Sequence, residues 1–205
     1  MNDAIAQFLN SVCECFSNHD SDIAQQLCDS LSSLCDQSEA DGVEPSRYPP
    51  RQVPACALLP DGASLSTQPY IQDLLACHQV LAWRHPGFGR LPPSLSDHLA
   101  VTELVGPDGM YAADNLRFGV LLQAGNVHYP VHQHAAEELY YVLHGTAGWG
   151  EHPNRLQRKP AGEFIHHRPF EPHCISTGSE LLVALWTWAG EINSASYAVD
   201  SAQVH

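Results

Sequence analysis

Four side chains that can bind a metal ion or carry a proton lie within nine consecutive residues of this chain. They are His132, His134, Glu138 and Tyr140, and His173 follows later in the sequence. Side chains two residues apart point to the same face of a β-strand, so a strand without a bulge would direct these four to one face. Imidazole nitrogens and carboxylate oxygens together bind divalent metals such as zinc, iron(II) or manganese. The pattern therefore predicts one divalent metal ion inside a small β-barrel.

The segments around these residues have the pattern of short β-strands separated by turns. Gly-Pro-Asp-Gly at 106–109 and Pro-Ala-Gly at 160–162 are strong turn signals. Short apolar segments joined by such turns are typical of an all-β barrel or jelly roll. Besides the segment with the candidate ligands, the predicted strands are residues 99–105, 116–122, 139–143, 146–149, 164–167, 173–177 and 181–188.

The N-terminal part of the chain has a different pattern, that of amphipathic helices. Apolar residues recur there at helical spacing, and prolines then accumulate in a stretch that predicts an extended linker. The predicted elements are helices at 3–17 and 22–36, a linker at 41–62, and a third helix from Thr67 or Gln68 to a point before Pro86.

These patterns predict a mainly β fold preceded by α-helices. Residues 1–97 are expected to form a helical region with its proline-rich linker, packed on the barrel. Residues 98–205 are expected to form the metal-binding β-barrel itself.

The chain is acidic, with a formal net charge of −14, and its first 46 residues hold nine Asp or Glu and no Lys or Arg. Nucleic acids and anionic membranes are bound by clustered Lys and Arg, so neither is expected as a partner. No apolar run is long enough for a signal peptide or a membrane span. Seven scattered cysteines, an odd number, indicate free thiols in a reducing cytoplasm. The oligomeric state is left open, and a homodimer is compatible with the sequence.

The ligand segment resembles the first signature of the cupin superfamily, whose members are double-stranded β-helix metal proteins. The resemblance lies in His132-x-His134-x3-Glu138-x6-Gly145, although the glycine before His132 stands one residue further away than usual. A Pro-x-Gly at 160–162 followed by a histidine resembles the second signature. Its histidine is His173 in our interpretation, because His173 begins a predicted strand after Pro172. The alternatives, His166 and His167, end the preceding strand.

A closer resemblance is to the cupin-type dimethylsulfoniopropionate lyases, which cleave this substrate to dimethyl sulfide and acrylate. It is carried by Tyr129, by Glu138-x-Tyr140, by Pro172-His173 and by Trp186-x-Trp188-x-Gly190. The resemblance implies that His134, Glu138 and His173 bind the metal, with Tyr140 at or near it. It further implies that His132 is an additional ligand or supports a ligand, and that Tyr129 and Trp188 line the pocket.

The implied substrate is a zwitterion with a carboxylate at one end and a sulfonium at the other. A divalent metal can bind the carboxylate as a Lewis acid while a base removes the proton α to it. Tyr140 is the predicted base and Tyr129 the second candidate; a free phenol has a pKa near 10, so either needs a nearby metal to lose its proton. A sulfonium favours aromatic faces, and Trp186, Trp188, Tyr129 and Trp149 are the candidates.

Two other functions use the same ligands. One is a different metal-dependent cupin enzyme, such as an iron-dependent dioxygenase. The other is a cupin that binds a metal or a small molecule without catalysis. A lyase turns over without dioxygen, which separates it from the dioxygenase, and the absence of any product would favour the binding protein. Fold alone does not decide among them.

Overall fold

Two antiparallel β-sheets of five strands each form the main body of the computed structural model, which describes residues 1–39, 46–63 and 69–200. The strand orders are β1-β2-β9-β4-β7 and β10-β3-β8-β5-β6. The strands are β1 (Leu99–Val105), β2 (Leu116–Gln123), β3 (His128–Gln133), β4 (Ala136–His144), β5 (Thr146–Gly150), β6 (Gln157–Pro160), β7 (Phe164–His167), β8 (His173–Thr177), β9 (Leu182–Gly190) and β10 (Ala198–Val199). This arrangement confirms the predicted mainly β, cupin-type fold.

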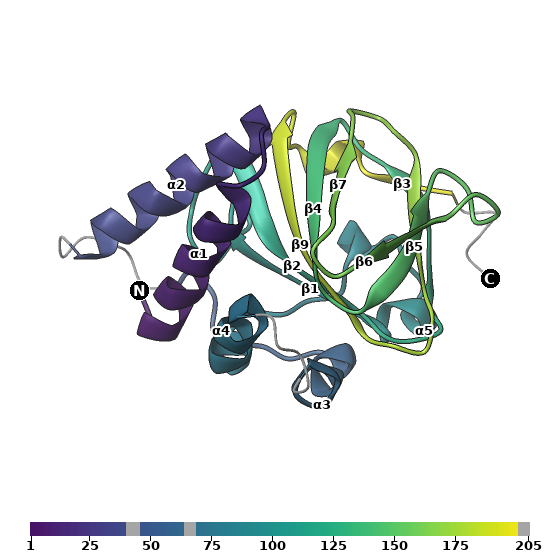
Figure 1. Cartoon of the computed structure of the whole chain (residues 1–205), viewed down its shortest axis with the longest axis horizontal. Coiled ribbons are helices and arrows are strands. Elements are labelled where there is room, and N and C mark those ends of the chain that lie inside the picture. The colour runs from purple at the N-terminus through teal and green to yellow at the C-terminus, as the bar shows by residue number, and fades with distance from the viewer. Residues whose placement is uncertain (40–45, 64–68, 201–205) are drawn as a thin grey trace.

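The α-helices are α1 (Asp3–Phe16), α2 (Asp22–Glu39), α3 (Leu59–Ala63), α4 (Pro69–Cys77) and α5 (Pro93–Ser96). Figure 1 shows α1 and α2 side by side against the outer face of the first sheet. The apolar face of α1 is buried, because residues at helical spacing turn toward α2 and α4, and Phe16 at its end contacts Tyr141 of β4. Asn2 and Ser21 cap the first two helices by accepting hydrogen bonds from the backbone N–H groups of Ala4 and Ala24.

Strand β4 separates two hydrophobic cores, because successive side chains point to opposite faces of a strand. Leu139, Tyr141 and Leu143 pack in the core shared with the helices, where the rings of Tyr141 and Phe16 lie 6.3 Å apart. Tyr140 and Val142 point the other way, into the barrel. The helical layer thus covers one face of the sheet and leaves the opposite face to line the barrel interior.

Several predicted strands agree with the structure, since residues 99–105, 164–167 and 173–177 coincide with β1, β7 and β8. Strands β6 and β10 were not predicted. The four residues of β6 are polar or half-buried and lie at the edge of a sheet, where apolar alternation is absent, and β10 has only two residues.

The prediction of an extended linker over 41–62 agrees with residues 46–53, which contain no helix, but is wrong from Pro54 onward. Residues Pro54–Leu58 form a 3-10 helix that continues into α3. Proline at the first helical positions is compatible with a helix, because its missing N–H has no intrahelical acceptor there. Residues 40–45 lie outside the described residues.

The third predicted helix is shorter than expected. Helix α4 ends at Cys77, a 3-10 turn follows over His78–Val80, and the chain then becomes extended. The chain is extended there because it pairs with Arg51. The Leu81 carbonyl accepts a hydrogen bond from the Arg51 N–H, and the Arg51 carbonyl accepts one from the Trp83 N–H. The predicted start at Thr67 or Gln68 lies outside the described residues.

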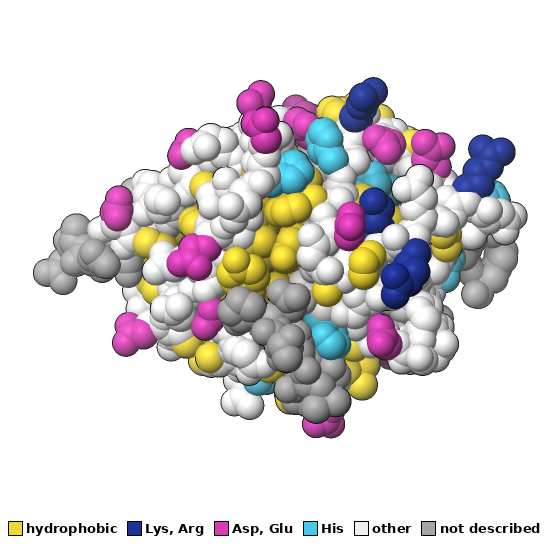
Figure 2. Space-filling model, in the orientation of Figure 1, with side chains coloured by type: hydrophobic (Ala, Val, Ile, Leu, Met, Phe, Trp, Pro, Cys, Tyr) yellow, Lys and Arg dark blue, Asp and Glu magenta, His cyan; other side chains and the backbone are white. Residues whose placement is uncertain are grey.

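On the face shown in Figure 2, the Lys and Arg side chains lie over the barrel, whereas Asp and Glu side chains lie over both the helices and the barrel. Among the described residues, none of the helices combines the length and the apolar character needed to cross a membrane.

Candidate metal centre and active site

The predicted ligand segment occupies two strands in different sheets. His132 lies on β3, which ends at Gln133, whereas Glu138 and Tyr140 lie on β4, which begins at Ala136. His134 lies in the connection between them. The expectation of one strand face is therefore wrong. The side chains still converge, because the two sheets face each other and the inner face of each points toward the same interior.

A bulge in β3 brings Tyr129 into the same interior. Tyr129 pairs with Ile175 and His132 with His173, so between these pairs two residues of β3 lie opposite one residue of β8. Pro130 lies within the irregular stretch and cannot donate to the sheet ladder. Simple alternation would place Tyr129 and His132 on opposite faces, but the bulge stacks their rings 4.5 Å apart.

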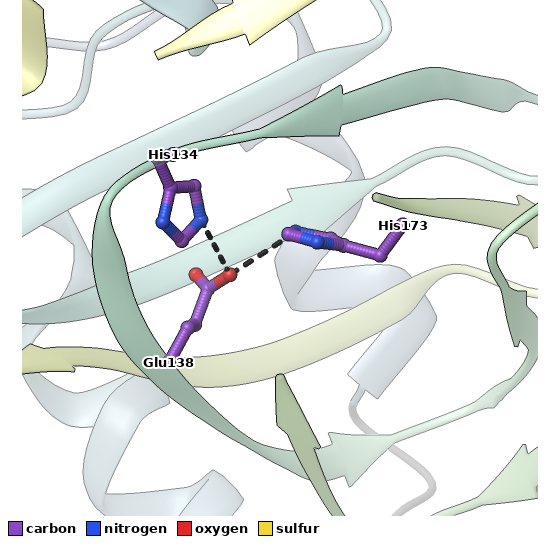
Figure 3. Close-up of side chains that lie close together, drawn as sticks. All are labelled: His134, Glu138 and His173. Carbon is purple, nitrogen blue, oxygen red and sulfur yellow. Dashed lines mark hydrogen bonds and ion pairs between the residues drawn. The ribbon is translucent and has the colours of Figure 1, made fainter. Parts of the chain in front are cut away.

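His134, Glu138 and His173 form a buried cluster in the barrel (Figure 3). One ligand atom from each of the three lies within 4.8 Å of the others. Glu138 Oε2 is 3.0 Å from His134 Nε2 and 3.1 Å from His173 Nε2. Each of the three residues is at most 2% exposed. This is the ligand set predicted for the metal, and the structure brings it together from β4, β8 and the β3–β4 connection.

Backbone carbonyls set the orientation of these imidazoles. Nδ1 of His134 lies 3.1 Å from the oxygen of Ala136, and Nδ1 of His173 lies 2.9 Å from that of Glu171. A carbonyl accepts only from a protonated nitrogen, so the neutral ring carries its proton on Nδ1 and a lone pair on Nε2. Both lone pairs then face a carboxylate oxygen, an arrangement that a bound cation satisfies. The cluster therefore fits a divalent metal.

Glu138 is held as a carboxylate by its neighbours. Burial alone raises its pKa, but His134 and His173 outweigh burial and lower the pKa well below the ordinary value when a proton occupies their Nε2 atoms, the position that a cation would take. Its second oxygen, Oε1, accepts a 2.7 Å hydrogen bond from Nε1 of Trp188. The Trp188 ring also lies 4.0 Å from that of His134. Trp188 thus contacts two of the three candidate ligands.

We expect Trp188→Phe to weaken metal binding by about 10- to 100-fold, the usual effect of removing a hydrogen bond that orients a ligand. The phenyl ring keeps the packing against His134 but cannot donate to Glu138. Metal affinity is measured by competition with a chromogenic chelator. Trp186→Phe is the matched control, because Trp186 lies on the same strand and its indole nitrogen has no hydrogen-bond partner among the described residues. Equal affinity of the two variants would contradict the role of the Trp188 N–H.

His132 and the second-motif histidines lie around the cluster in different ways. His132 packs its ring 4.1 Å from that of His173, but it is not one of the three residues whose ligand atoms lie within 4.8 Å of one another. His167 is buried and stacks on His173 with ring centroids 4.0 Å apart and an interplanar angle of 8°. His166 is exposed and pairs with Glu137. His167 is the strand partner of Glu138 on β7, but of the three second-motif candidates His173 is the one with a ring nitrogen 3.1 Å from a Glu138 oxygen.

A pocket opens beside the cluster and encloses about 560 Å³ of space, including its mouth, that protein atoms do not fill. Six of the sequence-predicted residues line it: Tyr129, His132, Glu138, Tyr140, Trp186 and Trp188. Trp186 and Trp188 share the inner face of β9, as alternation predicted, with rings 5.9 Å apart. Buried aromatic walls around a few polar groups are typical of a small-molecule site.

Two aromatic residues of this pocket were missed by sequence reasoning. Phe88 lies in a loop with a φ of 50°, between two glycines that also have positive φ. Tyr197 lies in a short segment after the last long strand. The Gly-Phe-Gly sequence is a signal for an irregular loop, and could have directed attention to Phe88. Tyr197 has no such signal, because only its tertiary neighbours place it in the pocket.

The two predicted phenols are both buried. Burial and the charge of Glu138 raise the pKa of Tyr140 well above the usual value, with smaller contributions from Tyr129 and from a hydrogen bond with Glu138. Burial likewise raises the pKa of Tyr129, whereas a hydrogen bond with Tyr197 lowers it. Without a cation beside them, both phenols therefore keep their protons. A nearby positive charge is needed for either phenol to lose its proton.

Two facing antiparallel sheets around a buried His/Glu/His cluster define a cupin-type protein with a candidate metal site. The family model for dimethylsulfoniopropionate lyase matches residues 24–184, and the chain belongs to this family. It is 33% identical over 162 residues to the dimethylsulfoniopropionate lyase DddQ of Ruegeria pomeroyi, a match that covers 76% of this chain and 79% of the relative.

Solved structures of lyases share the fold. The crystal structure of DddQ from Ruegeria pomeroyi aligns with a TM-score of 0.70 and 24% identity, over 94% of this chain and 99% of the other. A chain from the crystal structures of the lyases RdDddP and RnDddQII aligns with a TM-score of 0.69 and 21% identity, over 95% and 98% of the two chains. The shared architecture includes the helical layer, since the alignments extend beyond the barrel.

Proposed function

We propose that this protein is a metal-dependent carbon–sulfur lyase that cleaves dimethylsulfoniopropionate to dimethyl sulfide and acrylate. The observation that carries the proposal is the buried cluster of His134, Glu138 and His173, whose Glu138 lines one aromatic pocket together with two phenols. The family relationship supports the same substrate. Elimination from this substrate needs a Lewis acid, a base and aromatic side chains that can contact the sulfonium cation. This pocket contains residues suited to each task.

His134, Glu138 and His173 are the proposed ligands, and zinc, iron(II) and manganese all accept this set of nitrogen and oxygen donors. When bound, a divalent cation supplies positive charge that attracts the substrate carboxylate, stabilises charge developing on it and favours loss of a proton from a nearby phenol. Elemental analysis of the protein purified without added metal identifies which ion it takes up.

Tyr140 is the proposed base, and Tyr129 is the second candidate. The Tyr140 oxygen takes the proton from the carbon α to the carboxylate, and the electron pair of that C–H bond forms the double bond of acrylate. The bond between the β-carbon and sulfur breaks at the same time or just after, and dimethyl sulfide leaves as a neutral molecule with the bonding pair. The proton stays on Tyr140 until it passes to solvent.

The sulfonium end is proposed to lie against the rings of Trp186 and Trp188, whereas Tyr129, the third predicted residue of this pocket wall, is left to the carboxylate end. A sulfonium cannot donate a conventional hydrogen bond, so attraction to ring faces is its main specific interaction. Trp188 lines the pocket while its N–H is bound to Glu138 and its ring lies against that of His134. Trp186 has no hydrogen-bond partner for its indole nitrogen among the described residues, so it contributes a face alone.

The proposal is tested by incubating the metal-loaded protein with dimethylsulfoniopropionate and measuring dimethyl sulfide in the headspace. Acrylate should form in equal amount, and prior treatment with a chelator should abolish both products. The reaction is repeated without dioxygen, where a lyase retains its full rate and a dioxygenase does not. Metal-loaded protein that binds the substrate but releases no dimethyl sulfide would refute the proposed reaction.

A further inference from the structure

The segment after β9 crosses the pocket and is fixed to strand β3. Its strand β10 pairs with β3 at Ala198↔Gln133 and Val199↔His132. The backbone N–H of Asp200 donates to the oxygen of Val131, and the N–H of Ala135 donates to the hydroxyl of Ser196. Residues 196–200 are thus held against β3 and the β3–β4 connection, which carries His134.

This attachment places Tyr197 inside the pocket. Tyr197 is 4% exposed, and its ring lies nearly parallel to that of His134, with centroids 6.3 Å apart. Its hydroxyl oxygen is 2.8 Å from that of Tyr129. Within the described part of the chain, neither hydroxyl has a second hydrogen-bond partner. Two phenols are therefore joined to each other at the wall of the site.

In a hydrogen-bonded pair of phenols, one hydroxyl can orient the other as a hydrogen-bond donor to a substrate. Each hydroxyl has one proton and can accept a hydrogen bond. When Tyr197 donates to Tyr129, the Tyr129 proton remains available to the pocket, and the accepted bond polarises it. During the elimination, negative charge develops on the oxygens of the substrate carboxylate. A donor fixed in place before that charge develops lowers the barrier more than one that must reorient.

We propose that Tyr197 is a positioning residue for the elimination: it donates to Tyr129 and holds the Tyr129 O–H as a donor to the substrate carboxylate. This inference rests on the proposed lyase function. Tyr129 then stabilises developing charge while Tyr140 acts as the base. The role of Tyr197 is confined to its hydroxyl, since a phenylalanine would keep the ring beside His134.

The test is a double-mutant cycle of Tyr129→Phe, Tyr197→Phe and the double variant. We expect Tyr197→Phe to lower kcat about tenfold and Tyr129→Phe about 100-fold, the effect of losing one preorganised donor, with KM nearly constant. The double variant should be no slower than Tyr129→Phe, because Tyr197 acts only through Tyr129. Tyr141→Phe is the matched control: this buried tyrosine is next to Tyr140 but packs on the helical side of β4.

Binding provides a second readout. The nitronate of nitroethane is a planar anion with two oxygens that resembles the charged intermediate, whereas propionate resembles the ground-state carboxylate. On metal-loaded protein, Tyr197→Phe should weaken nitronate binding by about the same factor as kcat and propionate binding by less than about twofold. Thermal melting checks that all variants are folded.

The proposal is overturned by any of three results: wild-type kcat in Tyr197→Phe, losses that multiply in the double variant, or unchanged nitronate binding. Failure of the proposed lyase reaction gives a different set of results from failure of the proposed role of Tyr197. In that case the wild-type protein releases no dimethyl sulfide, while the comparison of nitronate with propionate still reports whether Tyr197 acts through Tyr129.

Discussion

Tyr140→Phe should lower the rate of dimethyl sulfide release by at least about 100-fold, the usual contribution of a general base. The substitution keeps the ring and its packing inside the barrel and removes the phenolic oxygen. Metal content, measured by elemental analysis, should stay near that of the wild-type protein, because His134, Glu138 and His173 are unchanged. The loss of rate without loss of metal is what separates a base from a ligand.

The pH dependence of the same variant provides a second measurement. A base accepts a proton only after losing its own, so the wild-type rate should rise with pH up to the pKa of the catalytic phenol. Burial and the charge of Glu138 raise the pKa of Tyr140 in the protein without a cation. The rise in rate should therefore occur at alkaline pH unless a bound cation lowers this pKa. This rise should vanish in Tyr140→Phe. If it persists with nearly full activity, Tyr129→Phe decides whether the other phenol is the base.

Glu138→Gln should remove most of the bound metal and with it the lyase activity. The substitution keeps the size of the side chain but removes the charge that His134 and His173 face at 3.0 and 3.1 Å. We expect metal affinity to fall by at least about 100-fold, more than the effect of changing a residue that only orients a ligand. Chelator competition measures the affinity, and activity should return in part at high metal concentration.

The histidine of the second motif is tested in parallel. His173→Ala should lose metal in the same way, because it removes one of three ligands. His166→Ala is the matched control, since His166 lies on the neighbouring strand β7 but is exposed and bound to Glu137. Full metal occupancy in His173→Ala would show that the ligand set has been assigned incorrectly, and His167 would be the next residue to test.

Residue types and spacing were sufficient to predict the kind of site. Two histidines, a carboxylate and a later histidine have few uses in combination other than metal binding, and turn residues at 106–109 and 160–162 separate strands whose ends they set. The placement of Trp186 and Trp188 on one face also followed from alternation alone. These are local properties, since a strand's period and a turn's residue types depend on neighbours in sequence.

Contacts distant in sequence decided the rest. His132 and Glu138 lie in different sheets because the chain turns at His134 and Ala135, and no local pattern distinguishes that turn from a continuing strand. The bulge that turns Tyr129 inward depends on its pairing with β8.

The hydrogen bond from Trp188 to Glu138 joins residues fifty positions apart, and that between Tyr129 and Tyr197 joins residues even further apart. Their donors and acceptors meet only after the two sheets have packed face to face. The sequence by itself therefore identified the candidate ligands and the class of chemistry. The tertiary structure decided which side chains orient those ligands, because that depends on neighbours across the barrel rather than along the chain.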